Sequence, residues 1–482
     1  MTDTTDTTTW LSRSAALLRA VGINTETSND KKPSAERDTT ERLKATLRRG
    51  AEALSPRELR RLLADLQAAS ASDLSDVEGG RLAEQVMAWY AKAKPEERKD
   101  LWLLLCEQFV PDISKIQSAR QKYESAIGTA DLAAAERQLR KALITPRTRL
   151  LQRFAVPQNG MRFLLDLRAE VLPLLKSDKH LLALDAELEH LFSGWFDVAF
   201  LELRSLNWDS PASLLEKLIK YEAVHDIRSW ADLKNRLDSD RRCYGFFHPR
   251  LPNEPLIFVE VALVDKMSDS ITPLLDETAA AADVSRASTA IFYSISNTQP
   301  GLRGVSFGDS LIKNVVETLV QEFPKLRNFA TLSPIPGFRA WLGKNAAAVW
   351  EAADKRRREE LAKALGLPTA QASDWLAAAD KALALEADSA AAKLLLHAAA
   401  VYLGKGLVDE RPLDPVARFH LGNGARVERL NWAGDPSPKG VKQSYGLMVN
   451  YLYDLKRLDK HRGMLAQGKI PMSSSVEALA KS

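Results

Sequence analysis

Apolar side chains recur at helical spacing through most of the first two hundred residues. Leu82, Val86 and Trp89 lie at positions i, i+4 and i+7, on one face of a helix. Pro95 ends that helix, and segments rich in Ala, Leu, Arg and Glu follow at 112–143 and 162–176. Clusters of β-branched residues are nearly absent. The pattern predicts an all-α module of stacked helical hairpins over residues 39–192.

The pattern of apolar residues changes after residue 193. Short runs of β-branched and aromatic residues alternate with turn residues and predict strands. These predicted strands lie at 243–248, 256–264, 289–296, 329–332 and 425–432. Residues 345–405 return to an Ala- and Leu-rich helical pattern between two strands. We therefore expect an α+β second part over 193–482, a mixed sheet with packed helices and a helical insertion at about 345–405.

Composition excludes several classes of protein. Lys plus Arg number 67 and Asp plus Glu 63, so the net charge of +4 gives no reason to expect a nucleic-acid partner. No apolar run approaches the roughly 20 residues of a membrane span, so we expect no membrane partner. Residues 1–38 are rich in Thr, Ser, Asp and Lys, which predicts a disordered N-terminus. Its acidic residues argue against a mitochondrial presequence, so a cytoplasmic location is expected.

The two cysteines, Cys106 and Cys243, are too few and too far apart for a disulfide framework or a zinc site. We expect both to be structural, in a reducing compartment. No cluster of His, Asp and Glu has the spacing of metal ligands, so no metal is expected.

A glycine-containing turn between a predicted strand and a predicted helix is the first candidate binding site. It comprises Arg303, Gly304, Val305, Ser306, Phe307, Gly308 and Asp309, and an amphipathic helix follows at 310–323. Free N–H groups and the dipole at a helix N-terminus favour an anion, and glycines let a phosphate approach the backbone. The turn lacks the spacing of a Walker loop or a dinucleotide fingerprint. It resembles the pyrophosphate loop of the Gcn5-related N-acetyltransferase superfamily, which implies binding of coenzyme A, although Ser306 stands where the first glycine usually stands.

Two further segments carry candidate chemistry. Ser333 follows the predicted strand 329–332 on a loop stiffened by two prolines. His420 precedes a Gly-rich turn and the predicted strand 425–432, so we expect both side chains on short loops at strand ends. The chain has no Gly-x-Ser-x-Gly elbow, which argues against an ordinary serine hydrolase.

Several distinctive blocks in a fixed order resemble the malonyl-CoA decarboxylase family. The blocks are Trp208–Pro211 with Glu222–His225, Arg241–Tyr244, Ala290–Ser296, Arg303–Gly308, Ser333–Phe338, Phe419–Gly424 and Gly446–Tyr451. The resemblance implies a helical domain for subunit contacts and an acetyltransferase-like catalytic domain. It also implies a catalytic pair, Ser333 and His420, with Ser294 and Tyr453 in support. Vertebrate members carry Glu where this chain has Ser306, which leaves the role of that carboxylate open.

The resemblance implies decarboxylation of malonyl-CoA to acetyl-CoA and CO₂ by a homo-oligomer, a dimer or a tetramer. No cofactor is expected, because the thioester itself accepts the electron pair and coenzyme A is part of the substrate. We expect His420, titrating near neutrality, to protonate the enolate, with Ser333 at the malonyl carboxylate. The alternatives are a CoA-dependent acyltransferase on the same fold and a helical scaffold without enzymatic activity.

Overall fold

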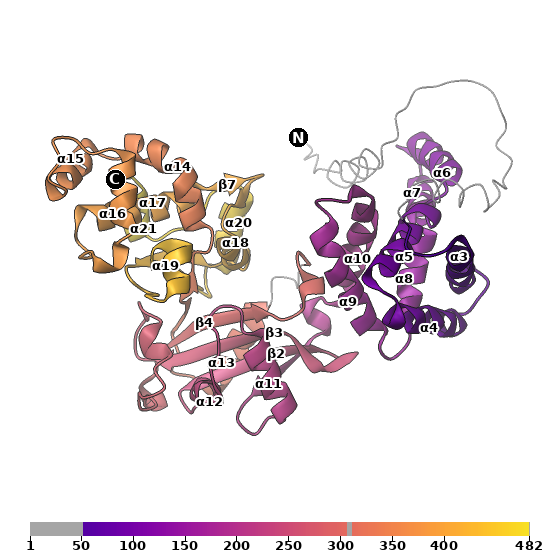
Figure 1. Ribbon diagram of the computed structural model, residues 1–482, viewed down its shortest axis with the longest axis horizontal. Helices are drawn as coiled ribbons and strands as arrows, with labels where there is room; N and C mark the ends of the chain where they lie inside the picture. The colour runs from indigo at the N-terminus through magenta and orange to yellow at the C-terminus, as the bar shows by residue number, and fades with distance from the viewer. Residues whose placement is uncertain (1–51, 306–310, 482) are drawn as a thin grey trace. The chain divides into compact units, whose positions relative to one another are not determined.

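The computed structural model describes residues 52–305 and 311–481 (Figure 1). The chain divides into two compact units, Met1–Arg60 and Arg61–Ser482, and the second contains every site discussed below. The predicted disordered segment 1–38 lies outside the described residues. Within the described ranges, no helix is long and apolar enough to cross a membrane. Cys106 and Cys243 are buried free thiols, as their isolation in the sequence predicts.

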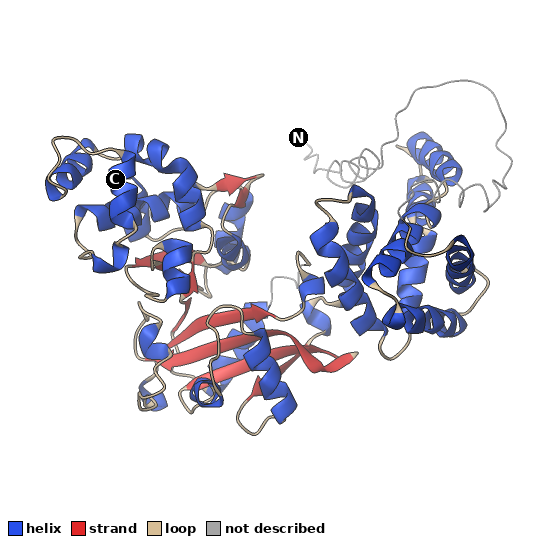
Figure 2. Ribbon diagram, viewed as in Figure 1, coloured by secondary structure: helices blue, strands red, loops and turns tan. Residues whose placement is uncertain are grey.

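All elements described before residue 200 are helical, which confirms the predicted all-α character of this part (Figure 2). Residue chemistry explains several boundaries. Pro95 occupies the first helical position of its helix, and the Asp112 side chain accepts from the N–H groups of Ser114 and Lys115. The helices are α3 (Pro56–Ser70), α4 (Asp76–Lys92), α5 (Pro95–Gln108), α6 (Ile113–Ala126), α7 (Leu132–Leu143), α8 (Pro146–Phe154), α9 (Gly160–Val171), η2 (Leu172–Leu174), η3 (Lys179–Leu181), α10 (Leu182–Trp195) and η4 (Val198–Phe200).

The rest of the chain is built on a mixed sheet, which confirms the predicted α+β class. Its strands are β1 (Glu202–Leu206), β2 (Arg241–His248), β3 (Leu251–Val264), β4 (Thr289–Asn297), β5 (Asn328–Thr331), β6 (Ser333–Pro334), β9 (Arg426–Asn431) and β10 (Met448–Leu452). In this described sheet, β1 to β5 follow in chain order. The strand β10 pairs with β5 and β6, and β9 also pairs with β10. The pair β4–β5 is parallel, and the other pairs are antiparallel.

The strand β3 begins earlier in the chain than the sequence predicts. Pro252 and Pro255 fall between the predicted strands 243–248 and 256–264, but both lie inside β3, which begins at Leu251. The register between β2 and β3 shifts on both sides of Phe247, and irregular pairing of this kind accommodates residues that lack a backbone N–H. The turn itself is therefore shorter than predicted.

A helical insertion separates β6 from the next strand, as the sequence pattern predicts. It comprises α14 (Phe338–Ala352), α15 (Lys355–Ala364), α16 (Ala372–Ala379), η8 (Ala382–Ala384) and α17 (Ala390–Lys405). Trp350 stacks on Trp375 in its core, with ring centroids 6.3 Å apart. A short hairpin of β7 (Leu407–Val408) and β8 (Arg411–Pro412) follows. The other helices are α11 (Ala212–Tyr221), α12 (Trp230–Arg236), η5 (Thr272–Leu274), η6 (Val284–Arg286), η7 (Pro300–Leu302), α13 (Leu311–Glu322), α18 (Pro415–Gly422), α19 (Pro438–Ser444), α20 (Leu458–Ala466) and α21 (Ser474–Lys481).

A bulge in β4 divides the sheet. Glu260 of β3 opposes Ser294, while the next residue of β3 opposes Phe292, so Tyr293 is an extra residue in β4. The parallel pairing of β4 with β5 ends at Phe292 and Thr331. Beyond that point β4 still pairs with β3, whereas β6, which follows β5 in the chain, pairs with β10. The two parts of the sheet therefore diverge directly after the bulge.

Helices α11 and α12 pack on one face of this sheet, against β3 and β2 respectively (Figure 1). Directly opposed residues of neighbouring strands point to the same face, so Cys243, Glu260 and Ser294 form a row under these helices. An apolar cluster surrounds the row and consists of Leu206, Leu215, Leu218, Ile227, Leu233, Cys243, Phe247 and Phe258.

A buried ion cluster lies within this layer. The Arg236 guanidinium pairs with Asp232 at 2.8 Å and with Glu260 at 3.1 Å, and it donates to the backbone oxygen of Asp226. Arg236 and Glu260 are each only 1% exposed. Burial, with the nearby charge of Glu222, raises the pKa of Glu260 to about 8 in spite of its arginine partner.

We predict that Arg236→Met strongly destabilises the protein, because it leaves Asp232 and Glu260 buried without their cation. Removal of one partner from a buried ion pair costs about 3–5 kcal/mol. The free energy of unfolding, measured by urea titration, should fall by that amount. The exposed pair Arg356–Glu360 provides the matched control, and Arg356→Met should leave the unfolding midpoint unchanged. An Arg236→Met protein as stable as wild type would show that the cluster does not support the fold.

Candidate active site

Ser333 and His420 lie 87 residues apart in the chain, and the structure brings their side chains together. The Ser333 Oγ and His420 Nε2 atoms are 3.3 Å apart, and both residues are buried. Ser333 lies in β6, at the point where the sheet divides.

The position of His420 corrects one expectation. His420 was predicted on a Gly-bounded loop, but it lies in the last turn of α18. Asp414 caps this helix through the N–H groups of Val416 and Ala417, and Pro415 occupies its first position. The helix is only eight residues long, so its apolar spacing is too brief to distinguish from a loop. A helix holds the imidazole more firmly than the predicted loop would.

Tyr453 completes the hydrogen-bonded group on the other side of the imidazole. Its hydroxyl lies 2.7 Å from His420 Nδ1, directly after the end of β10. Its ring makes an edge contact with Phe292, and burial raises its pKa well above the usual value. The phenol therefore stays protonated, and its O–H is available as a donor to Nδ1.

Thr331 is a member of this group that the sequence analysis missed. The Ser333 hydroxyl donates to Thr331 Oγ1 at 2.8 Å, and the backbone N–H of Tyr451 donates to the same oxygen at 3.1 Å. Because the Ser333 proton points to Thr331, Ser333 Oγ presents lone pairs to His420. A neutral His420 therefore donates to Ser333 from Nε2–H, and its Nδ1 accepts from the Tyr453 hydroxyl. The direction of donation runs from Tyr453 through His420 and Ser333 to Thr331.

Burial determines the charge of His420. Loss of solvent lowers the pKa of His420 from its ordinary value to about 3, and no opposite charge counteracts this effect. The expectation that His420 titrates near neutrality is therefore wrong for the substrate-free protein. The sequence could not reveal this, because it depends on how deeply α18 is packed. The neutral imidazole agrees with the Nε2–H tautomer that its neighbours impose.

Ser294 has different partners from those expected. Register places Ser294 on the face of Glu260, whereas Phe292 and its neighbour Thr331 belong to the opposite face. The Ser294 hydroxyl lies 2.8 Å from each carboxylate oxygen of Glu222. None of the hydrogen bonds among the described residues joins Ser294 to Ser333, His420 or Tyr453.

Glu222 belongs to one of the blocks that carry the family resemblance, but the sequence analysis gave it no role. Its carboxylate also accepts from Ser296 and from the backbone N–H groups of Val224 and His225. Lys439 of α19 donates to the backbone of the same loop at Ala223. This loop is thus fixed between β4 and α19. The carboxylate of Glu222 anchors both serines of β4.

The candidate phosphate loop is described only in its first part. Arg303 and Gly304 are exposed, and Gly304 has a φ of 84°, a conformation that favours glycine. Val305 is buried, whereas Ser306, Phe307, Gly308 and Asp309 lie outside the described residues. The helix α13 begins shortly afterwards at Leu311. The order of strand, turn and helix is as the sequence predicts.

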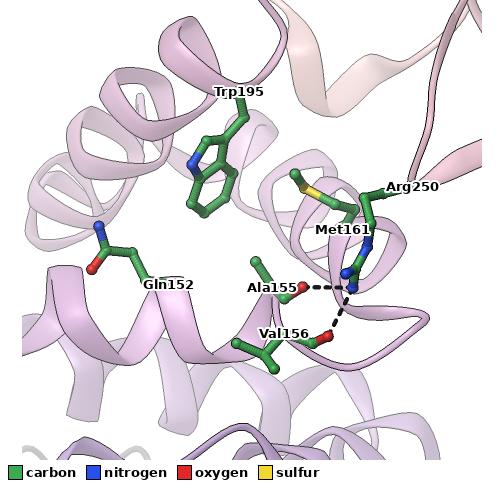
Figure 3. Close-up of a pocket in the computed structure, with 6 residues that line it drawn as sticks. All are labelled: Gln152, Ala155, Val156, Met161, Trp195 and Arg250. Carbon is green, nitrogen blue, oxygen red and sulfur yellow. Dashed lines mark hydrogen bonds between the residues drawn. The ribbon is translucent and has the colours of Figure 1, made fainter. Parts of the chain in front are cut away.

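None of these groups lines a surface pocket of about 380 Å³ (Figure 3). It is lined by Gln152, Ala155, Val156, Met161, Trp195 and Arg250. Arg250 contributes its charge to this wall, but one of its nitrogens already donates to the backbone oxygens of Ala155, Val156 and Pro157. The remaining lining is mainly apolar and offers no acid, base or nucleophile, so the pocket is not the candidate active site.

Comparison with known proteins identifies the family. A family model described as "Malonyl-CoA decarboxylase C-terminal domain" matches residues 199–482, and one described as "Malonyl-CoA decarboxylase N-terminal domain" matches residues 109–196. The mitochondrial malonyl-CoA decarboxylase of Anser anser anser is 36% identical over 405 residues, covering 78% of each chain. The corresponding protein of Mus musculus is also 36% identical and covers 78% of this chain and 80% of its own.

Solved structures agree with the family models. The crystal structure of malonyl-CoA decarboxylase from Rhodopseudomonas palustris has a TM-score of 0.74 and 41% identity, covering 87% of this chain and 99% of its own. That from Cupriavidus metallidurans has a TM-score of 0.72 and 43% identity, covering 88% and 100%. The chain belongs to the malonyl-CoA decarboxylase family. It is accordingly an enzyme, of the carboxy-lyase class.

We predict that His420 is a neutral Nε2–H imidazole in the substrate-free protein. Its pKa of about 3 lies below that of exposed histidines, so its ring should not gain a proton between pH 7 and 5. Nitrogen NMR of protein labelled in its histidine rings measures both charge and tautomer, with the exposed His180 as an internal reference.

Two variants make this measurement specific. The signal absent from His420→Asn identifies the ring. Tyr453→Phe removes the donor to Nδ1, so the Nδ1–H tautomer should become populated. A charged ring in the wild type at pH 6 would contradict the neutral assignment.

Proposed function

We propose that this chain decarboxylates malonyl-CoA to acetyl-CoA and CO₂, with His420 as the proton donor to carbon and Ser333 as its partner. The observation that carries the proposal is the buried network of Ser333, His420 and Tyr453 beside the point where β4 and β5 diverge. Such a network offers a hydroxyl and an imidazole of fixed tautomer in surroundings that exclude water.

The chemistry requires only groups that the chain possesses. When the bond between the malonyl carbon and its carboxylate breaks, the electron pair moves onto the thioester as an enolate, and CO₂ leaves. The α-carbon then takes a proton, and acetyl-CoA results. Because the thioester accepts the electron pair, we propose that no metal or added cofactor takes part. The protein must orient the carboxylate and supply the proton.

The carboxylate of the substrate would give His420 the neighbouring negative charge that the substrate-free protein does not provide. An anionic carboxylate next to an imidazole favours the protonated form, so the arriving malonyl group raises the pKa of His420. His420 then takes up a proton from solvent and passes it to the α-carbon of the enolate, which returns the imidazole to its neutral form. Tyr453 keeps the ring oriented through Nδ1. The Ser333 hydroxyl either turns from Thr331 to donate a hydrogen bond to the malonyl carboxylate or relays a proton on its way to the enolate carbon.

The supporting role of Ser294 is a prediction. The hydroxyl proton of Ser294 is already donated to Glu222, so Ser294 Oγ can act towards a ligand only as a hydrogen-bond acceptor. This arrangement suits an amide N–H, such as those in the pantetheine arm of coenzyme A. The divergence of β4 from β5 beyond Phe292 leaves one edge of β4 without a described backbone partner, along which an extended amide chain can bind.

The phosphates of coenzyme A are proposed to bind at the loop of Arg303 and residues 304–309, before the N-terminus of α13. Gly304 allows close approach of an anion to the backbone, and the exposed Arg303 adds a positive charge. An acyltransferase would use the same loop. The Ser333–His420–Tyr453 network is what favours decarboxylation over that alternative.

Subunit association through the helical part remains a prediction. Ile113, Ile127 and Ile144 belong to the hairpin of α6 and α7 and its ends, and they are 48%, 62% and 58% exposed. Apolar side chains of this kind are suited to an interface in a dimer or a tetramer. A cytoplasmic location is likewise a prediction. The two curated relatives are named as mitochondrial, and the two solved structures come from bacteria.

We predict that His420→Ala and Ser333→Ala each lower kcat on malonyl-CoA by about 10²–10⁴-fold, the usual contribution of general acid catalysis. Release of acetyl-CoA and CO₂ is measured in buffer with and without a chelator, and the chelator should have no effect. The double variant should lose less than the product of the two factors, because the residues act as a unit. A His420→Ala enzyme with nearly wild-type kcat and an unaltered solvent isotope effect would transfer the donor role to Tyr453.

We predict that Arg303→Ala raises the KM for malonyl-CoA by about tenfold and leaves kcat nearly unchanged. A remote phosphate contact of this strength is lost equally in the ground state and the transition state. Steady-state kinetics over a range of malonyl-CoA concentrations separate the two constants. An unchanged KM with a collapsed kcat would instead assign Arg303 to the chemical step.

A further inference from the structure

The loop before the proposed phosphate site is held from the helical part of the chain. The side chain of Arg168, in α9, donates to the backbone oxygen of Gly301 at 2.7 Å and to that of Arg303 at 3.0 Å. Its Nε atom pairs with Asp185 of α10 at 2.8 Å. The buried guanidinium of Arg168 thus connects α9 and α10 with Gly301 and Arg303, the two ends of the short segment that leads into the proposed loop.

The Arg168 guanidinium is buried, so its hydrogen bonds to Gly301 and Arg303 cannot be replaced by water. Arg168 is 1% exposed, and the Asp185 side chain is 15% exposed. A cation removed from water requires the hydrogen bonds that it makes, since each unsatisfied donor is costly. The guanidinium therefore fixes the two carbonyl groups in place.

The backbone of the loop also packs directly on α9. A Cβ atom at Gly301 would lie 2.1 Å from the backbone oxygen of Leu165, so only glycine fits there. Arg162, one turn earlier on α9, donates to the side chain of Gln299 at 2.6 Å. Gln299 in turn donates to the backbone oxygen of Pro255 in β3. The segment 299–303 is therefore fixed between α9 and the sheet.

We propose that Arg168 is a positioning residue for coenzyme A: from the helical part of the chain, it sets the conformation of residues 301–304, the described start of the loop proposed to bind the phosphates. The inference rests on the proposed function and deepens it. By fixing the carbonyl groups of Gly301 and Arg303, Arg168 determines the direction in which the Arg303 side chain and the Gly304 N–H point. Among the described residues, Arg168 makes no hydrogen bond or ion pair with Ser333, His420 or Tyr453, so its influence is on binding of the nucleotide part and not on the chemical step.

The test compares two substrates. Malonyl-pantetheine has the same reacting thioester as malonyl-CoA but lacks the phosphates and the adenosine. Arg168→Gln should raise the KM for malonyl-CoA by about tenfold, the usual effect of losing charged hydrogen bonds, and change kcat less than about twofold. On malonyl-pantetheine, kcat/KM should equal that of the wild type. A variant with a generally disturbed site would lose activity on both substrates.

Arg147 provides the matched control. It is another buried arginine of the helical part, but it pairs with Glu187 and donates to the backbone oxygens of Leu105 and Cys106. Arg147→Gln should lower the thermal midpoint to a similar extent without raising the KM for malonyl-CoA. If both arginine variants raise KM equally, the effect is one of stability and the proposal is overturned.

Two further measurements separate an effect on the loop from the loss of a charge and from a failure of the proposed reaction. Gly301→Ala displaces the same loop from α9 without removing a charge, and it should also raise the KM for malonyl-CoA only. Binding of free coenzyme A by calorimetry should weaken in Arg168→Gln by the same factor as KM. Failure of the wild type to decarboxylate malonyl-CoA would refute the proposed reaction, whereas the coenzyme A affinities would still decide the role of Arg168. Equal affinities of wild type and Arg168→Gln would overturn the inference.

Discussion

The single extra residue in β4 is the constraint on which the site depends. Tyr293 shifts the register between β3 and β4, and the parallel pairing with β5 ends at the same level. Beyond this level β4 pairs with β3 alone, and Ser333 pairs with β10. The divergence brings the hydroxyl of Ser333 next to a helix from a much later part of the chain. A local irregularity of one residue thus determines where the hydrogen-bonded network forms.

Much of the architecture could be predicted from the sequence because its patterns are long and regular. The helices before residue 200, the strands β2, β4 and β9 and the helical insertion all follow from apolar spacing. The strand β10 was not predicted, although it pairs with β5, β6 and β9. It has only five residues, contains the polar Asn450 and is buried on both faces, so its sequence does not alternate. Asn450 is polar for a structural reason, since it donates to the backbone oxygen of Thr331 at 2.7 Å.

The site was predictable as a set of residue types but not as a network. Resemblance to a family indicated Ser333, His420 and Tyr453, and the structure brings these three together. It did not indicate Thr331, and it included Glu222 in the block Glu222–His225 without indicating that the carboxylate binds Ser294 and Ser296 of β4. Nor could it give the charge of His420, because a pKa depends on the depth of burial. Contacts between distant segments, such as Arg168 with Gly301, have no signature in a single sequence.

The insertion between β6 and β7 has a consequence for how the enzyme folds. Tyr402, near the end of α17, donates to Asp414, the residue that caps the helix of His420. The Tyr402 hydroxyl also lies against Gly337, just before α14, where a Cβ atom would be 2.3 Å away. These contacts of Tyr402 join the two ends of the insertion in the folded protein, and closing so long a segment delays contacts between its ends during folding. During refolding, the stacked pair Trp350–Trp375 should form within the insertion as a local event, and the catalytic pair should assemble afterwards. Synthesis on the ribosome imposes the same order, since the whole insertion emerges before His420 does.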